Sequence, residues 1–212
     1  MALRGNYNTR ILDMAYFFKG SKILAPLSIT SNEPVFDVDT ISLSKQRASQ
    51  GAQRWELSFK TVSSGATEAD IFVGMVTGIS SAETMVMPQL PSVVTANNSS
   101  SVLAVNTAAA AGVSSVTVVS DGVVSKGSFI KFSNHDKIYM VTADVAAGTV
   151  AVPIYPQLRT AVTTSHTFLT SNSTSSAVIL SYYRDVSNLR GLTFTDGILS
   201  STGSINLVEA VT

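Results

Sequence analysis

Residues 127–142 read GSFIKFSNHDKIYMVT, and this stretch decides how the surrounding part of the chain folds. Two apolar runs, FIKF at 129–132 and IYMV at 138–141, enclose the polar run SNHDK. Short polar side chains such as Ser, Asn and Asp favour turns because they hydrogen-bond their own backbone, whereas runs of four apolar residues are typical of strands. The stretch therefore predicts a β-hairpin with His135 and Asp136 at its tip.

The adjacent His135 and Asp136 also have a catalytic interpretation, as part of a hydrolase with an unidentified serine nucleophile. Two features argue against it. Neighbouring residues of a strand point to opposite faces, and the chain has no G-x-S-x-G motif that would present a nucleophile. We therefore expect no enzyme and no catalytic residue. As an exposed turn residue, His135 should tolerate replacement by alanine at a cost below about 0.5 kcal/mol.

The clearest strand outside this hairpin is RWELSFKT at 54–61. Trp55, Leu57 and Phe59 alternate with polar residues, which predicts a strand with one buried and one solvent-facing side. If Trp55 belongs to the core, its replacement by alanine should cost about 3 to 5 kcal/mol.

Other segments give weaker signals. PVFDVDTISLSKQR at 34–47 should be extended, and because its apolar residues change parity we expect a bulge or bend near Asp39 and Thr40. TRILDMAYFFKG at 9–20 is compatible with a short helix or a strand. ETMVMPQL at 83–90 predicts a short strand.

One segment has helical periodicity. Residues 67–79, TEADIFVGMVTGI, carry apolar residues spaced by three or four positions: Ala69, Phe72, Val76 and Ile79. This spacing places them on one face of a helix. Thr67 and Asp70 stand three residues apart, as in a capping box, although Asp replaces the usual Glu or Gln. We therefore predict one good helix here, weakened by Gly74.

Two polar tracts divide the chain. PSVVTANNSSS at 91–101 is interpreted as a linker with turn residues, and TSNSTSS at 170–176 is similar. Between them, short apolar runs separated by Gly, Asn and Asp predict a small barrel or sandwich. The expected fold is mainly β: a β-sandwich-like domain of residues 1–96 and 177–212 with one helix, and an inserted small β-barrel (OB-like) at 97–176.

Composition and charge exclude several classes of protein. Charged residues make up only 13% of the 212 residues and hydrophobic ones 45%, so we expect much of the surface to be covered by other subunits. A net charge of zero gives nucleic acid little attraction, and no sequence-specific nucleic-acid binding is expected. No apolar run reaches the length of a membrane-spanning helix, and the first ten residues lack the apolar centre of a signal peptide.

Neither metals nor cofactors are expected. The chain has no cysteine and only two histidines, His135 and His166, which is too few for a transition-metal site. DVD at 37–39 places two carboxylates on one strand face, but it lacks the ligand number of a calcium loop, so a solvent-facing strand is favoured. No phosphate-binding or dinucleotide-binding glycine motif is present.

Three tracts allow both an internal and an intermolecular interpretation. The basic run KQRASQGAQR at 45–54 is either a solvated loop or strand end, or a contact with another subunit or with a lumen. The apolar tracts MVMPQLPSVV at 85–94 and AAAAGV at 108–113 either pack internally or form seams between subunits.

The order of these elements resembles that of the distal tail proteins of long-tailed bacteriophages. Such tail proteins often carry a pattern G-x-x-I-x-F … Y-x-V … G … V-x-I-x-P-x-L-R in their inserted unit. The matching residues here are Gly127, Ile130, Phe132, Tyr139, Val141, Gly148, Val152, Ile154, Pro156, Leu158 and Arg159. A second match is GAQRWELSF at 51–59. The resemblance covers residues from about 41 to 190.

This resemblance implies a non-enzymatic structural virion protein that forms a ring, commonly six-fold, in the distal tail or baseplate. The sandwich-like domain would continue the tail tube, and the barrel would face outward. Expected partners are further copies of the chain in a homohexamer, the tail tube protein and other baseplate or tail-tip proteins. The expected location is the phage tail, after assembly in the host cytoplasm. The alternative is a carbohydrate- or host-binding adhesion module, which would favour clustered aromatic residues.

Overall fold

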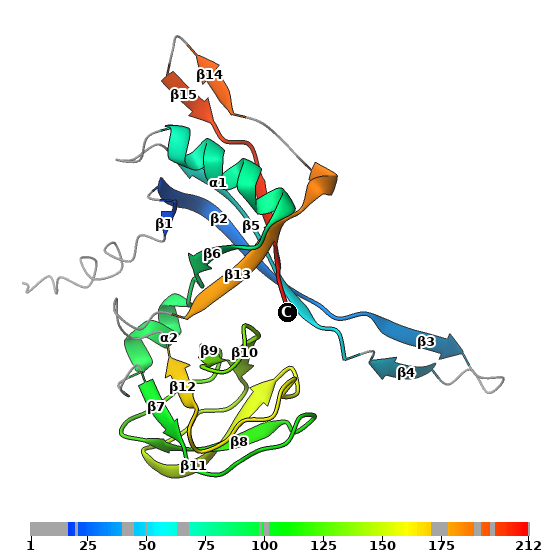
Figure 1. The fold of residues 1–212 in the computed structure, drawn as a ribbon, viewed down its shortest axis with the longest axis vertical. Helices are drawn as coiled ribbons and strands as arrows, with labels where there is room; N and C mark the ends of the chain where they lie inside the picture. Colours follow the sequence, from blue (N-terminus) through cyan, green and yellow to red (C-terminus); the bar gives the residue numbers. More distant parts are fainter. Residues whose placement is uncertain are drawn as a thin grey trace, which may run out of the picture.

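The computed structural model describes residues 17–19, 21–39, 45–49, 51–62, 68–97, 99, 102–170, 178–188, 192–195 and 198–211. Over these ranges the protein is mainly β, with a curled sheet, a closed barrel and two projecting hairpins (Figure 1). The predicted mainly β fold with an additional small barrel is therefore confirmed.

A six-stranded antiparallel sheet forms one part of the molecule. The strands, in spatial order, are β1 (Phe17–Phe18), β2 (Ser21–Asn32), β5 (Arg54–Val62), β16 (Ile205–Glu209), β13 (Ile179–Arg184) and β6 (Glu83–Val86). The outermost strands, β1 and β6, also contact each other, so the sheet curls. The sheet combines strands that precede the barrel with strands that follow it. β6 confirms the short strand predicted at this position.

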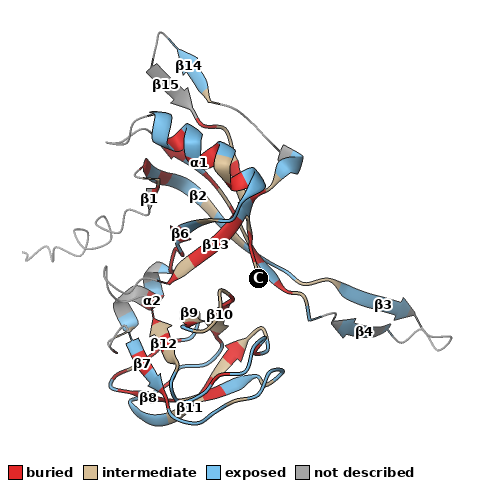
Figure 2. Ribbon diagram, viewed as in Figure 1, coloured by how far each residue is buried: buried red, intermediate tan, exposed pale blue. Residues whose placement is uncertain are grey.

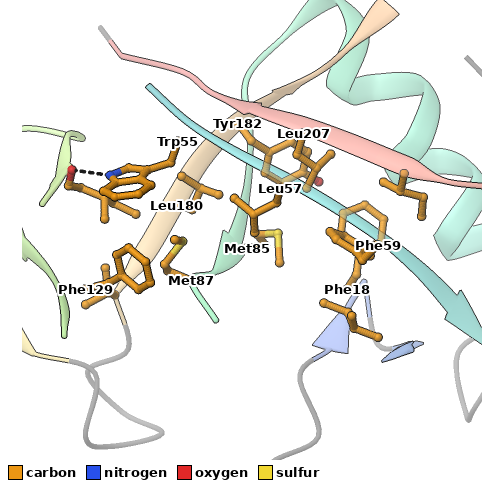
Figure 3. Packing of buried hydrophobic residues seen from close by; sticks show 14 of the residues in the cluster. Phe18, Trp55, Leu57, Phe59, Met85, Met87, Phe129, Leu180, Tyr182 and Leu207 are labelled. Carbon is orange, nitrogen blue, oxygen red and sulfur yellow. Dashed lines mark hydrogen bonds between the residues drawn. The ribbon is translucent and has the colours of Figure 1, made fainter. Parts of the chain in front are cut away.

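Strand β5 confirms the predicted alternation. Trp55, Leu57 and Phe59 are 4%, 1% and 2% exposed, whereas Arg54 and Lys60 are exposed to solvent. Figure 3 shows the three buried side chains within the sheet core. Their neighbours there include Phe18, Met85, Leu180, Tyr182 and Leu207.

Helix α1 (Glu68–Ser80) confirms the predicted helix, but the side that it buries is not the apolar face identified from the spacing. The helix packs against β13 and β6 through Ile71 and Met75, which are 0% and 2% exposed. Of the predicted apolar face, Phe72, Val76 and Ile79 are 53%, 48% and 39% exposed, and Ala69 is also exposed. Figure 2 shows that α1 carries both buried and exposed residues along its length. Because the helix is apolar on several sides, spacing alone could not identify the side that meets the sheet.

The expected cap of this helix cannot be compared with the structure, because Thr67 lies outside the described residues. Gly74 and Gly78 lie on the buried side of the helix. A Cβ at Gly74 would stand 2.7 Å from Cγ of Lys19, so the glycine leaves room for that side chain.

Two strands form an arm that projects from the sheet (Figure 1). β3 (Val35–Asp39) and β4 (Lys45–Ser49) pair antiparallel over their whole length. The predicted bulge or bend near Asp39 and Thr40 within one extended segment is wrong, because β3 and β4 are two separate strands between which the chain reverses direction. Residues 40–44 lie outside the described part of the chain.

A second, shorter hairpin lies near the carboxyl end of the chain. It pairs β14 (Thr193–Thr195) with β15 (Ile198–Ser201), and a 3-10 turn, η1 (Val186–Asn188), precedes it. Figure 1 shows this hairpin beyond α1, on the side opposite the barrel.

The second part of the molecule is a closed barrel in which the strand order is β10, β11, β8, β7, β12 and β9. Their bounds are β7 (Val102–Val105), β8 (Ser115–Ser120), β9 (Phe129–Phe132), β10 (Ile138–Val141), β11 (Gly148–Tyr155) and β12 (Thr167–Thr170). β9 and β10 pair antiparallel, with Ile130 opposite Tyr139, which confirms the predicted hairpin. The barrel core contains most apolar residues of the tail-protein pattern: Ile130, Phe132, Tyr139, Val141, Val152, Ile154 and Leu158.

The polar tract at 91–101, predicted to be a linker with turns, contains a short helix, α2 (Pro91–Ala96). The one good helix that the sequence predicts is α1, and α2 is a further helix of only six residues. Proline suits the first turn of a helix, where its missing N–H would have no partner. Gly127, with φ +85°, approaches this helix so closely that a Cβ there would stand 3.2 Å from Cδ1 of Leu90. The second polar tract falls mostly within residues 171–177, which are not described, so the exact domain limits remain predictions.

Candidate functional site

A buried ion pair lies where the barrel meets the sheet. Lys137, in the β9–β10 connection, donates to the carboxylate of Glu209 on β16, and the two side chains are 2% and 0% exposed. Lys137 Nζ also donates to Gln53 Oε1 at 2.6 Å. The carboxylate of Glu209 accepts the backbone N–H groups of Trp55 at 3.1 Å and Ile138 at 2.8 Å. Burial lowers the pKa of Lys137, and the neighbouring carboxylate opposes that shift.

Trp55 is the second link between sheet and barrel. Its Nε1–H donates to the carbonyl oxygen of Ile138 at 2.9 Å (Figure 3). Its ring meets that of Phe129 edge to face, with centroids 5.1 Å apart. The amide of Gln89 forms two hydrogen bonds of 2.9 Å with the backbone of Phe129. Polar and apolar contacts together therefore hold β9 and β10 against the sheet.

His135 takes part in a chain of hydrogen bonds at the hairpin tip. The backbone N–H of Arg159 donates to the hydroxyl of Tyr139 at 3.0 Å, and that hydroxyl contacts His135 Nε2 at 2.7 Å. His135 Nδ1 contacts Asn134 Oδ1 at 2.8 Å, and Asn134 Nδ2 donates to the carbonyl of Ala161 at 3.0 Å. These partners assign the proton of the neutral ring to Nδ1. Burial lowers the pKa of His135 to about 4, which keeps the ring neutral.

The structure corrects the interpretation of His135 as an ordinary exposed turn residue. The ring is half-buried and stacks on Phe132, with centroids 5.9 Å apart. Asp136 does not pair with the histidine. Its carboxylate accepts a hydrogen bond of 2.7 Å from Lys131 Nζ. The ring nitrogens therefore face Asn134 and Tyr139, and the two adjacent residues form no catalytic dyad.

Replacing His135 with alanine should lower the free energy of unfolding by about 1 to 3 kcal/mol at pH 7, because the buried Tyr139 hydroxyl loses its acceptor. This cost should shrink between pH 6.5 and 4. As the pH falls through that window, His135 of the unfolded chain binds a proton, whereas His135 of the folded protein, with a pKa of about 4, stays neutral. The free energy of unfolding of the wild-type protein therefore decreases, and that of the variant, which lacks the ring, is not changed by this residue.

Urea unfolding followed by circular dichroism at pH 7, 6 and 5 measures both effects. The matched control is His166→Ala, since His166 lies on the same barrel and its Nδ1 accepts the N–H of the nearby Thr163 at 3.0 Å and approaches the Thr163 hydroxyl. A His135→Ala variant as stable as wild type at pH 7 would restore the exposed-turn interpretation.

Exposed apolar side chains gather on two elements. On α1 they are Phe72, Val73, Val76 and Ile79, with exposures between 39% and 57%. On the arm they are Val35, Phe36 and Val38, which are 48%, 63% and 60% exposed. We call the first set the helix face, and we call Phe36 and Val38, which share one side of β3, the arm face. Contiguous exposed apolar surface of this kind marks sites of association in soluble proteins.

In the single chain, both apolar tracts contribute side chains to the two cores, and the basic run lies partly on the exposed arm. Met85 and Met87 are 7% and 1% exposed and pack within the sheet core. Ala109 and Val113 pack against the barrel core. In the basic run, Arg47 and Lys45 lie 3.4 and 3.7 Å from the Asp37 carboxylate on the exposed arm, as expected for a solvated strand.

A cleft of about 500 Å³ lies between the base of the arm and the barrel. From the sheet side, Glu33, Gly51 and Gln53 line it. From the barrel side, the lining residues are Lys137, Tyr155, Pro156, Gln157, Leu158, Arg159, Ala111 and Gly112. The buried ion pair therefore borders the cleft through Lys137.

No cluster of three or more metal-ligating side chains occurs within the described residues. In the same part of the chain, no helix is long and apolar enough to cross a membrane. Compared with known proteins, the chain matches no family model and no curated protein.

Sequence reasoning missed Lys137 and Glu209. One signal for Glu209 was available, because Ile205, Leu207 and Glu209 share one parity in the strand run INLVE, and all three are buried. A charged residue at a buried strand position requires a partner. Nothing in the sequence around Lys137 indicated which residue that partner would be.

Proposed function

We propose that this chain is a non-enzymatic structural subunit that associates with copies of itself into a ring in the distal tail or baseplate of a bacteriophage. The observation that carries the proposal is the helix face together with the arm face. Both expose large apolar side chains on a chain with only 13% charged residues. Subunit contacts in a ring would cover such surfaces and keep them from water.

Two further features support self-association. The arm is an isolated two-stranded hairpin, and such hairpins are marginally stable in water unless they pack against something else. In addition, β2 pairs with β1 only at Ser21 and Lys22, so among the described residues most of its outer edge has no neighbouring strand. Unpaired strand edges are sites where another chain can add.

The resemblance to distal tail proteins supplies the finer part of the proposal. The ring is proposed to be a homohexamer, with the tail tube protein and other baseplate or tail-tip proteins as neighbours. The chain would be assembled in the host cytoplasm and would remain in the virion. Immunogold electron microscopy of virions with antibodies against the purified protein tests this location, and label absent from every tail would contradict it.

The helix face gives the sharpest test of association. Replacing Phe72 and Val76 together with aspartate should convert the wild-type oligomer to monomer, because two charges would have to be buried in a subunit contact. Native mass spectrometry measures the change, and circular dichroism shows whether the fold is kept. The matched control is Ala147→Asp, which adds a charge at an exposed position of the barrel. A monomeric wild type, or a double variant that still assembles, would contradict the role of the helix face.

A further inference from the structure

An apolar groove of about 420 Å³ lies along strand β2. Five apolar residues of β2 between positions 23 and 29 line it, together with Gln89 and Leu90. Leu24 and Leu90 are 38% and 41% exposed there, and Leu27 and Ile29 pack against the sheet core, so the groove borders that core. Apolar side chains placed in the groove would therefore remove apolar surface from water.

The same stretch of β2 lies at an open edge of the sheet. On one side β2 pairs with β5 along most of its length, whereas on the other side β1 reaches only Ser21 and Lys22. Among the described residues, no strand pairs with the outer edge of β2 beyond Lys22. A groove beside such an edge suits an extended segment, because its backbone can pair with the strand while alternate side chains enter the groove.

The β1–β2 hairpin determines which part of the chain approaches this edge. Phe17 lies opposite Lys22, and Phe18 lies opposite Ser21. The connection between the two strands has two residues, and Lys19 there has the positive φ, +47°, that such tight turns require. Because the hairpin is antiparallel, the chain that precedes β1 is directed back along β2, toward the groove.

The residues that precede β1 have a pattern that fits the groove. They lie outside the described residues, and the last seven of them read RILDMAY. If the register of the hairpin continues, Tyr16 comes opposite Ile23, and the two side chains share one face of the sheet. Leu12 and Met14 have the same parity as Tyr16. Since Ile23 is only 8% exposed and lines the groove, all three side chains would be on the groove side.

We infer that residues 10–16 continue β1 as an edge strand along β2, and that Leu12, Met14 and Tyr16 fill the groove. The occupant belongs to the same chain, because the two-residue connection brings it to this edge without a further loop. The inference is independent of the proposed ring. The added strand becomes the outermost strand of the sheet, so the sheet still ends in an edge that another chain can reach.

Paired cysteines test the register, since the chain contains no cysteine of its own. Antiparallel ladders alternate between hydrogen-bonded and non-hydrogen-bonded pairs, and counting from the pair that closes the turn, Ala15 and Leu24 form a pair of the second kind. Its Cα atoms would be about 4.5 Å apart, a separation that a disulfide can bridge. The full chain with Ala15→Cys and Leu24→Cys should therefore form a disulfide within one molecule under mild oxidation. Non-reducing electrophoresis and peptide mass spectrometry detect it.

The matched control combines Ala15→Cys with Thr30→Cys. Thr30 lies on the same strand, six residues beyond Leu24 or roughly 20 Å further along β2, so this pair should form no disulfide within one chain. Absence of the Ala15–Leu24 disulfide would overturn the inference. A disulfide that joins two chains would assign the segment to a second copy and would overturn it as well.

Hydrogen exchange followed by mass spectrometry tests whether the segment fills the groove. Leu12→Asp should speed the exchange of the amides of residues 24–29 at least about tenfold, because an aspartate in the apolar groove would displace the strand that protects them. Ile11→Asp, on the opposite parity, is the matched control and should leave this exchange unchanged. Equal exchange in the two variants would contradict the inference. Both readouts concern a single chain, so a monomeric wild type, which would contradict the ring, leaves them unaffected.

Discussion

Replacing Lys137 with methionine is expected to lower the free energy of unfolding by about 3 to 5 kcal/mol, because the substitution leaves an unpaired carboxylate in the protein interior. Glu209 is 1% exposed as a residue, and its side chain is fully buried, so water cannot replace the lost ammonium group. The same substitution removes the hydrogen bond to Gln53 Oε1. Urea unfolding followed by circular dichroism at pH 7 measures the change.

Two variants separate the buried charge from simple loss of packing. The double variant Lys137→Met with Glu209→Gln should be more stable than Lys137→Met alone, because no charge remains and the glutamine oxygen still accepts one of the backbone N–H groups. The matched control is Lys131→Met, which breaks the more exposed pair with Asp136 and should cost no more than about 1 kcal/mol. Equal costs for Lys137→Met and Lys131→Met would show that the buried pair contributes little.

The second large effect is expected at Trp55. Its replacement by alanine should cost about 3 to 5 kcal/mol, since a side chain only 4% exposed leaves a cavity between sheet and barrel. The cost includes the lost hydrogen bond to the carbonyl of Ile138 and the lost ring contact with Phe129. Thermal and urea unfolding followed by circular dichroism are suitable measurements, because they do not depend on the indole itself.

Trp55→Phe tests which part of the side chain matters. It keeps an aromatic ring but loses the N–H donor, so it should cost less than alanine at the same position. Phe36→Ala on the exposed arm face is the control for removing an aromatic ring, and in the isolated chain it should change stability by less than about 0.5 kcal/mol. An unfolding curve of Trp55→Ala that coincides with wild type would mean that the side chain is not part of the core.

The features that could be predicted from the sequence were those fixed by local pattern. Alternation placed Trp55, Leu57 and Phe59 on the buried side of a strand, and the polar run around His135 identified a hairpin tip. The buried side of α1 could not be predicted, because Phe72 and Ile71 are both apolar and only packing against the sheet decides which of them is buried. The hydrogen-bond chain that includes the His135 ring contains Tyr139 and backbone groups more than twenty residues further along the chain. No local sequence pattern predicts such contacts.

The candidate site was less predictable than the fold for the same reason. Gln53, Lys137 and Glu209 meet from three separate parts of the chain. Strand parity indicates that Glu209 faces inward, but pairing across the sheet–barrel boundary depends on how the two units dock. The cleft likewise exists only because the arm base and the barrel lie side by side.

The position of Trp55 has a practical consequence for experiments. The chain contains a single tryptophan, and that residue lies at the contact between the sheet and the barrel. Fluorescence excited at the red edge of the absorption spectrum, where tyrosine absorbs little, therefore comes from Trp55 alone. The native protein thus carries its own optical probe of whether its two parts stay docked, and no dye has to be attached.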